Sequence, residues 1–133
     1  MNTLLTAINT SMINLELSPS ISPLSSGTIP TTLQNKTFSI DFQTVNSNKY
    51  RDKDKLRLKH SLKIIFIKQH GLDPAAVQAD CITLEESIIR LLLNQTEFPS
   101  YRVSYESSNR ILTFASEYVL TEITFDIEQD FSL

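Results

Sequence analysis

The stretch Lys55–Gln69 constrains the fold of this chain more than any other part of the sequence. Over its first half, leucines occupy even positions and basic residues occupy most of the odd positions. A two-residue period sends successive side chains to opposite faces of a sheet, whereas a helix would spread the same lysines around its circumference. The alternation ends in the apolar run Ile64–Ile67, which indicates burial on both faces. The pattern predicts a long central strand with one basic face over its first half.

Periodic segments on both sides of this strand predict two helices and several shorter strands. Residues Thr3–Leu17 space their apolar side chains by three and four, which is typical of an amphipathic helix, and Pro19 is expected to end it. Pro74–Asn94 repeats that spacing, with Glu85 and Glu86 expected on its solvent side. Alternating residues predict further strands at Lys36–Gln43, Tyr101–Glu106, Arg110–Ala115 and Val119–Glu128. A tight turn at Ser107–Asn109 is expected to join the second and third of these.

These elements predict an α+β fold. An N-terminal helix and one long middle helix are expected to cover a mostly antiparallel sheet with a long central strand. The length of 133 residues fits a single domain, 1-133. Two segments lack periodicity: a long Ser/Pro-rich loop at 18–35, expected to be disordered or to wrap across a neighbour, and a charged hairpin loop at 44–54, expected to project as a mobile tip.

The distribution of charge is more informative than the net charge of −3, which argues against a general affinity for nucleic acid or anionic membrane. Most of the 12 basic residues fall between Lys49 and Lys68, while the tail from Glu117 onward contains acidic residues and no basic one. Such separation indicates complementary surfaces, either within the domain or between copies of it.

This separation defines the candidate interface for a second subunit or another partner. Tyr50 is an aromatic residue between two cations, a combination common at interface anchors, although it could instead fold back on its own hairpin. The predicted interface consists of Lys49, Tyr50, Arg51, Lys53, Lys55, Arg57, Lys59, Glu122, Asp126 and Glu128.

No pattern of residues indicates a catalytic, cofactor-binding or metal site, so the sequence predicts a protein that is not an enzyme. Cys81 is the single cysteine and lies on the apolar side of the predicted second helix, which is typical of a buried residue. Two glycines are too few for a glycine-rich phosphate loop. His60 lies among core-facing leucines and is expected to pack there or to lie at an interface, and His70 is expected in an exposed turn.

Two other functions fit parts of the sequence. The basic segment 49–63 could bind nucleic acid, although it contains one aromatic residue and two aspartates. A small hydrolase could use His60 or His70, although no nucleophile-elbow pattern accompanies them. The apolar runs are too short to span a bilayer, and no secretory signal is expected, so the protein is expected in a cytoplasm or in a particle.

In chain length and order of elements, the sequence resembles the tail terminator family of long-tailed bacteriophages, the lambda-type minor tail proteins. The resemblance covers roughly residues 36–128 and includes the long strand KLRLKHSLKIIFI and the closing segment YRVSYE…ILTFASEYVLTEITFDIE. The Ser/Pro-rich loop 18–35 matches least well. Other small neck, tail-completion and head-closure proteins share some of these features.

The resemblance implies a ring of six subunits that caps the tail tube, stops its polymerisation and provides the joint to the head. The implied partners are other copies of the chain, the tail tube protein, the head-side connector or neck protein, and sheath or sheath-terminating proteins. DNA would pass through the ring without specific binding, and no membrane or cofactor is implied. The implied location is the tail-neck region of the virion, after assembly in the host cytoplasm.

Overall fold

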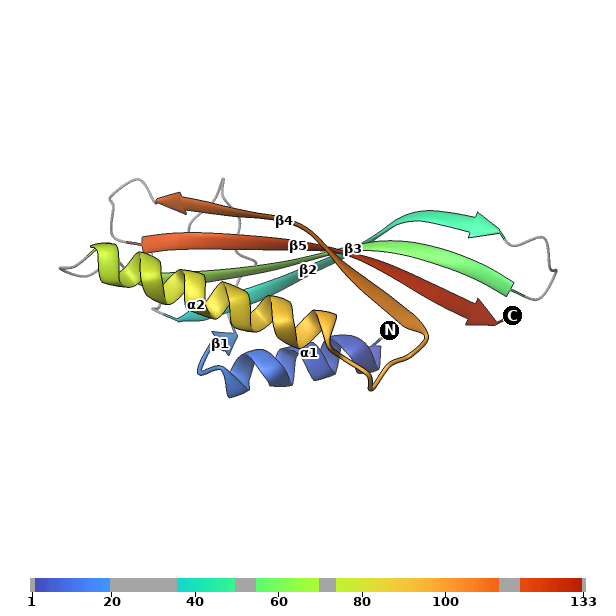
Figure 1. The fold of residues 1–133 in the computed structure, drawn as a ribbon. Coiled ribbons are helices and arrows are strands. Elements are labelled where there is room, and N and C mark those ends of the chain that lie inside the picture. The colour runs from blue at the N-terminus through green and yellow to red at the C-terminus, as the bar shows by residue number, and fades with distance from the viewer. Residues whose placement is uncertain (1, 20–35, 50–54, 70–73, 113–117, 133) are drawn as a thin grey trace.

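The computed structural model describes residues 2–19, 36–49, 55–69, 74–112 and 118–132 of the chain. Figure 1 shows two helices on one face of a long, twisted sheet. In chain order the elements are α1 (Asn2–Asn14), β1 (Ser18–Pro19), β2 (Thr37–Lys49), β3 (Lys55–Gln69), α2 (Pro74–Leu93), β4 (Tyr101–Leu112) and β5 (Tyr118–Ser132). The predicted α+β fold, with an N-terminal helix and a long middle helix, is confirmed.

The central strand of the sheet is β3, which spans the stretch predicted from the alternation. The five strands have the order β1-β2-β3-β5-β4, and all neighbours are antiparallel except the short β1, which is parallel to β2. β5 pairs with β3 over its full length, from Lys55 opposite Ser132 to Gln69 opposite Tyr118. The basic strand and the acidic strand are therefore direct neighbours in one sheet.

The main hydrophobic core lies between the two helices and the sheet face that they cover, here called the helix face. Even-numbered residues of β3 and odd-numbered residues of β5 point to this face, among them Leu62, Phe66 and Phe125, which are fully buried. Met12 of α1 and Ile88 of α2 are buried against them. Full burial of one such side chain stabilises the fold by about 1.5–3 kcal/mol, so these contacts fix the helices on the sheet.

The opposite side of the sheet, here called the open face, is polar over most of its area but has a small apolar cluster at one end. Ile65, Ile67 and Leu120 are buried there, with Ile111 packed against them. This confirms the prediction that the apolar end of β3 is buried on both faces.

Helix α1 ends earlier than predicted, and it ends before Pro19 is reached. Glu16 has a positive φ of 67°. Its backbone N–H donates to the carbonyl of Ile13 at 3.0 Å, and that of Leu17 donates to Met12 at 3.2 Å. This pairing is a Schellman motif, in which Leu17 and Met12 are both buried and supply the accompanying apolar contact. The buried Leu17 rather than the proline sets the end of the helix.

Two predicted breaks in the strands were wrong. The expected turn at Ser107–Asn109 is part of the continuous strand β4, where a bulge between Tyr105 and Ser107 shifts the pairing by one residue. The charged loop was expected to begin at Thr44, but β2 continues to Lys49 past a bulge between Thr44 and Asn46. Serine, asparagine and lysine are tolerated in both places because β2 and β4 lie toward the sides of the sheet and have an open face.

Candidate functional site on the sheet arm

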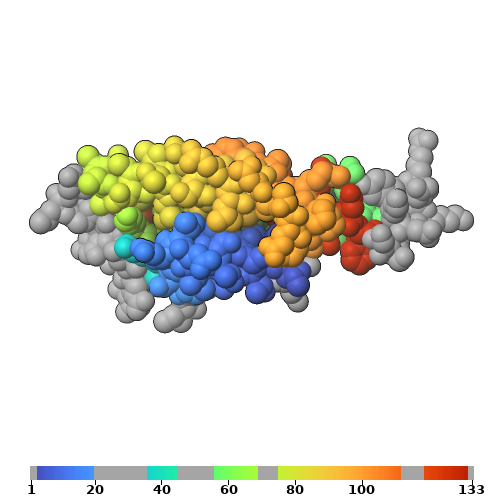
Figure 2. Space-filling view, turned by 60° about the horizontal axis from the view of Figure 1, so that its bottom comes forward, coloured from blue at the N-terminus to red at the C-terminus, as the bar shows by residue number. Residues whose placement is uncertain are grey.

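One end of the sheet projects past both helices, and this projection, here called the arm, is the candidate functional site. It consists of Asn46–Lys49 of β2, Lys55–Lys59 of β3 and Glu128–Ser132 of β5, with the start of β4 at its root. In Figure 1 these strand ends extend to the right of α1 and α2, toward the C-terminus. Figure 2 shows the helices covering the main part of the molecule and leaving that end outside the helix layer.

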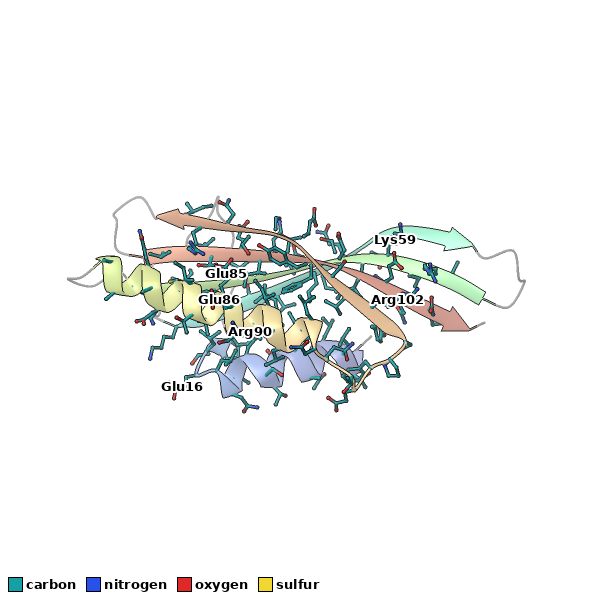
Figure 3. The ribbon with its side chains drawn as sticks, viewed as in Figure 1. Glu16, Lys59, Glu85, Glu86, Arg90 and Arg102 are labelled. Atoms are coloured by element: carbon teal, nitrogen blue, oxygen red, sulfur yellow. The ribbon has the colours of Figure 1, made fainter. Side chains whose placement is uncertain are left out.

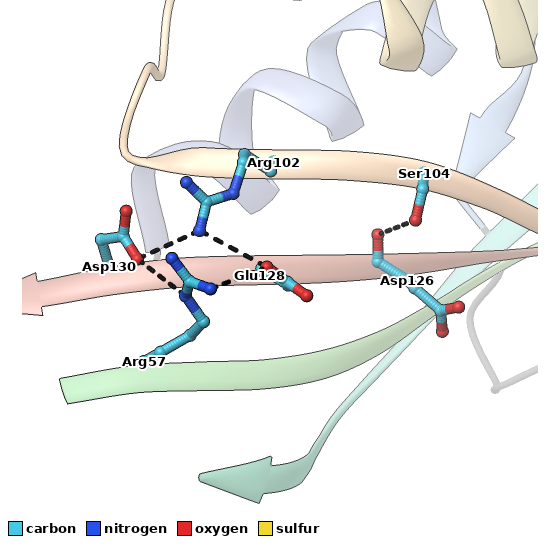
Figure 4. A network of polar contacts seen from close by, with 6 residues as sticks. All are labelled: Arg57, Arg102, Ser104, Asp126, Glu128 and Asp130. Atoms are coloured by element: carbon cyan, nitrogen blue, oxygen red, sulfur yellow. Dashed lines mark hydrogen bonds and ion pairs between the residues drawn. The ribbon is translucent and has the colours of Figure 1, made fainter. Parts of the chain in front are cut away.

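The open face of the arm has a network of two arginines and two carboxylates (Figure 4). Arg57 of β3 lies 3.2 Å from Asp130 and 3.8 Å from Glu128, measured between nitrogen and oxygen. Arg102 of β4 approaches the same two carboxylates from the other side, at 3.3 Å from Asp130 and 3.4 Å from Glu128. Each carboxylate therefore has two cations, and β5 is linked electrostatically to both of its neighbouring strands.

This network decides a question that the sequence left open. The basic and acidic surfaces could have paired within one domain or between copies, and Arg57 and Glu128 pair within one sheet. Lys59 stands directly opposite Glu128 in the same register. For these residues, charge complementarity between copies is no longer needed to explain the pattern.

The structure separates the other predicted interface residues. Asp126 is opposite Ser61 and Ser104, just outside the arm, and the Ser104 hydroxyl donates to the backbone carbonyl of Asp126 at 3.4 Å. Glu122 is opposite Ile65, far along β5 and outside the arm. Lys49 and Lys55 end β2 and begin β3 at the tip of the arm. Their side chains, and all of Tyr50, Arg51 and Lys53, lie outside the described residues.

A polar row marks the boundary between the core and the arm on the helix face. His60 is 4% exposed and packs against Phe42 with the two rings tilted by 38° and 4.7 Å between their centroids. Its Nδ1 lies 3.1 Å from the Thr44 hydroxyl and its Nε2 lies 2.9 Å from the Gln129 amide oxygen. In the neutral ring Nε2–H donates to Gln129 and Nδ1 accepts from Thr44, so both nitrogens have partners. This geometry agrees with the packing role expected for His60.

Beyond this row, apolar side chains resume on the helix face of the arm. Phe131 is 45% exposed and stands directly opposite Leu56, and Leu58 is the next residue on the same face of β3. Phe131 is not among the predicted interface residues, because it lies in the polar segment EQDFSL after the expected end of the last strand. The alternating pattern could have indicated it, because Phe131 continues the odd-numbered apolar series of Ile123, Phe125 and Ile127.

A second polar arrangement joins α2 to β4 away from the arm. Glu85 is 7% exposed and pairs with Arg110, so the prediction that it lies on the solvent side was wrong. Glu86, by contrast, is exposed and forms a pair with Arg90 along the helix at 3.7 Å. In Figure 3 Glu85, Glu86 and Arg90 lie along α2, well separated from Lys59 in the arm and Arg102 at its root. The Glu85–Arg110 pair fixes the helix to the outer strand.

The expected burial of Cys81 is confirmed, and burial raises the pKa of its thiol. Among the described residues, no group of three or more His, Cys, Asp or Glu side chains is arranged to hold a metal ion. The helices in the described part of the chain are too short or too polar to cross a membrane. Compared with known proteins, the chain matches no family model and no curated sequence.

Proposed function

We propose that this chain is a non-enzymatic structural protein that closes into a ring on the end of a bacteriophage tail tube. In that role it stops tube polymerisation and offers a surface to the head-side connector. The proposal combines the resemblance to tail terminators with an α+β fold that has the expected order of helix, long strand pair, helix and strand pair.

The observation that carries the proposal is the arm. Its polar face has internally paired charges, and its other face has Leu56, Leu58 and Phe131, which belong to strand ends that extend past the helices (Figure 1). A sheet end of this kind supplies contact area, and an exposed aromatic residue is a common anchor of protein interfaces. Such an arm suits a subunit that contacts its neighbours.

The proposal is tested by the mass and position of the assembled protein. Light scattering over a range of concentrations, with and without purified tail tubes of the cognate phage, should show a ring that forms at least in the presence of tubes. Electron microscopy should then show one ring at the end of each tube and no further tube growth. A protein that remains monomeric with tubes, and leaves their growth unchanged, would refute the proposal.

The nucleic-acid alternative is less well supported by the same geometry. Arg57 would have to exchange the carboxylates of Glu128 and Asp130 for phosphates. When a protein binds duplex DNA, the logarithm of its binding constant falls with the logarithm of the salt concentration, with a slope of about −0.9 for each phosphate that it neutralises. Binding of a DNA duplex at low salt with such a slope would favour this alternative over the structural role.

A further inference from the structure

The apolar series on the helix face of β3 and β5 is longer than the layer that covers it. Moving toward the arm, Leu62 is 0% exposed and His60 is 4% exposed, and Leu58 and Leu56 are then only partly buried. On β5, Ile127 is 1% exposed while Phe131 is 45% exposed. An apolar series usually stops where its cover stops. Here it is interrupted by the polar His60 row and then resumes.

The lengths of the elements account for the uncovered part. β3 has 15 residues and spans about 50 Å at about 3.3 Å per residue. α2 has 20 residues and spans about 30 Å at about 1.5 Å per residue. The sheet is therefore longer than its helix layer by about 20 Å, which equals the length of a helix of about 13 residues.

Within the described residues, the outer row of α1 is a surface that fits the length of sheet left outside the helix layer. The helix has 13 residues, NTLLTAINTSMIN, and none is charged. Its exposed residues at spacings of three, four and three are Thr3, Thr6, Thr10 and Ile13, and Ile13 is 48% exposed. Figure 2 shows α1 beside α2 on the surface of the molecule. β-Branched residues lose little side-chain freedom on contact, and the centres of interfaces are depleted of charge.

We infer that the helix face of the arm, formed by Leu56, Leu58 and Phe131, docks on the outer row of α1 of a second copy of this chain. The two surfaces differ and lie on different elements, so the contact is heterologous. Repetition of a heterologous contact gives a ring or an open chain rather than a two-fold dimer. This inference rests on the proposed function for the closure of the ring, and it names the two surfaces that meet in it.

The size of the contact supports a ring over an isolated dimer. A face about 20 Å long and three strands wide, at about 4.8 Å per strand, covers roughly 300 Å² on each partner. The total of roughly 600 Å² is half of the roughly 1,200 Å² at which stable interfaces begin. In a closed ring each copy makes two contacts, and the last contact forms within one assembly. We therefore expect monomers and closed rings, with no populated dimer.

Two pairs of matched substitutions test the surfaces separately. Thr10→Lys places a charge in the centre of the outer row of α1. Thr83→Lys is its control on α2, because both threonines are exposed and donate to the carbonyl four residues earlier at 3.0 Å. Phe131→Ser removes the anchor of the arm, and Tyr105→Ser is its control, because Tyr105 is 43% exposed but lies outside the arm. Each test variant should lower the ring fraction by about tenfold or more, while each control should retain it.

Cysteine pairs distinguish this arrangement from its alternatives. A mixture of the Phe131→Cys and Thr10→Cys proteins, oxidised with copper phenanthroline, should give a disulfide-linked dimer containing one copy of each. The native Cys81 is buried and should not interfere. Phe131→Cys alone should remain unlinked. Efficient linkage of Phe131→Cys to itself would overturn the inference in favour of a two-fold contact between arms.

The outcomes also separate the inference from the proposed function. If the parent protein forms rings on tubes but the mixed disulfide does not form and Phe131→Ser still assembles, the docking inference is wrong and the proposed function stands. If the mixed disulfide forms but the parent neither closes into rings nor caps tubes, the two surfaces meet and the proposed function is wrong. If neither occurs, both are wrong.

Discussion

Removal of the two arginines on the open face of the arm should weaken folding without affecting ring formation. The four nitrogen–oxygen distances range from 3.2 to 3.8 Å, and the side chains are 32% to 53% exposed. Exposed pairs of this kind contribute about 0.2–1 kcal/mol each. We therefore expect Arg57→Ala and Arg102→Ala each to lower the free energy of unfolding by about 0.5 kcal/mol.

The double substitution should cost more than the sum of the two single ones. Glu128 and Asp130 are two residues apart on one strand, so their Cα atoms are about 7 Å apart and their carboxylates lie on the same face, where both contact one nitrogen of Arg102. Either arginine alone still neutralises both of them. With both arginines removed, two like charges remain together, and we expect a loss of about 2 kcal/mol, a coupling of about 1 kcal/mol.

Urea unfolding measures this cycle through the midpoint, provided that the slope of free energy against urea is unchanged. Lys63→Ala is the control, because Lys63 lies on the same face of β3 but outside the network. Ring formation by the double variant should equal that of the parent under conditions where both are folded. Strict additivity would refute the shared network. Loss of ring formation by a fully folded double variant would show that these arginines contact another copy.

Three further predictions concern the body of the domain. Arg110→Met leaves Glu85 buried without its partner and should lower the free energy of unfolding, measured with heat or urea, by about 2–4 kcal/mol. Arg90→Ala at the exposed pair should lower it by less than about 0.5 kcal/mol, and equal losses would contradict the burial argument. His60→Ala should lower the free energy of unfolding in urea by about 2–4 kcal/mol, because it removes two hydrogen bonds and a ring from the edge of the core. An unchanged free energy of unfolding would contradict the packing role of His60. Burial raises the pKa of Cys81 from 9.0 and that of Tyr101 from 10.0, so the unfolded chain releases these protons at lower pH than the folded chain, and stability should fall as pH rises above about 9. Cys81→Ala should reduce this fall, and an unchanged pH profile of the variant's stability would contradict the role of the buried thiol.

The elements of this fold followed from periodicity, while their ends did not. The alternation of Lys55–Gln69 predicted β3 along its full length because one face of that strand is buried throughout its covered part. The polar segments at Asn46–Lys49 and Ser107–Asn109 looked like turns because serine and asparagine favour turns in isolation. They are strands because each is held by a long neighbouring strand and has an open face. Pairing over long distances in the sequence overrode local preference.

The candidate site was predicted in part. The separation of basic and acidic charge identified β3 and β5, and Arg57 with Glu128 is the contact that explains it. Their adjacency in one sheet could not be read from the sequence, because strand order depends on which loops cross the sheet. Glu85 is buried instead of exposed because it pairs with Arg110, which is 25 residues later in the chain and could not be matched to it from the sequence. The one indication of Phe131 in the sequence was its odd position in the series of Ile123, Phe125 and Ile127, because the polar residues before it suggested that the strand had already ended.

Salt separates the two roles that the arm could have in assembly. If the basic and acidic surfaces met between copies, raising NaCl from about 0.05 M to about 0.5 M would screen them and dissolve the rings. The charges in the network are already paired within one sheet, and the proposed contact between copies contains no charged residue: it places Leu56, Leu58 and Phe131 against the row of threonines and Ile13 on α1. NaCl should therefore leave the ring fraction unchanged. Sulfate should increase the ring fraction, because salts that are excluded from the protein surface strengthen the burial of apolar side chains. Light scattering of the parent protein with tail tubes over this range measures the effect. Rings that dissolve as NaCl rises would return the interface to the charged face of the arm, and the Arg57→Ala, Arg102→Ala double variant would then lose ring formation as well.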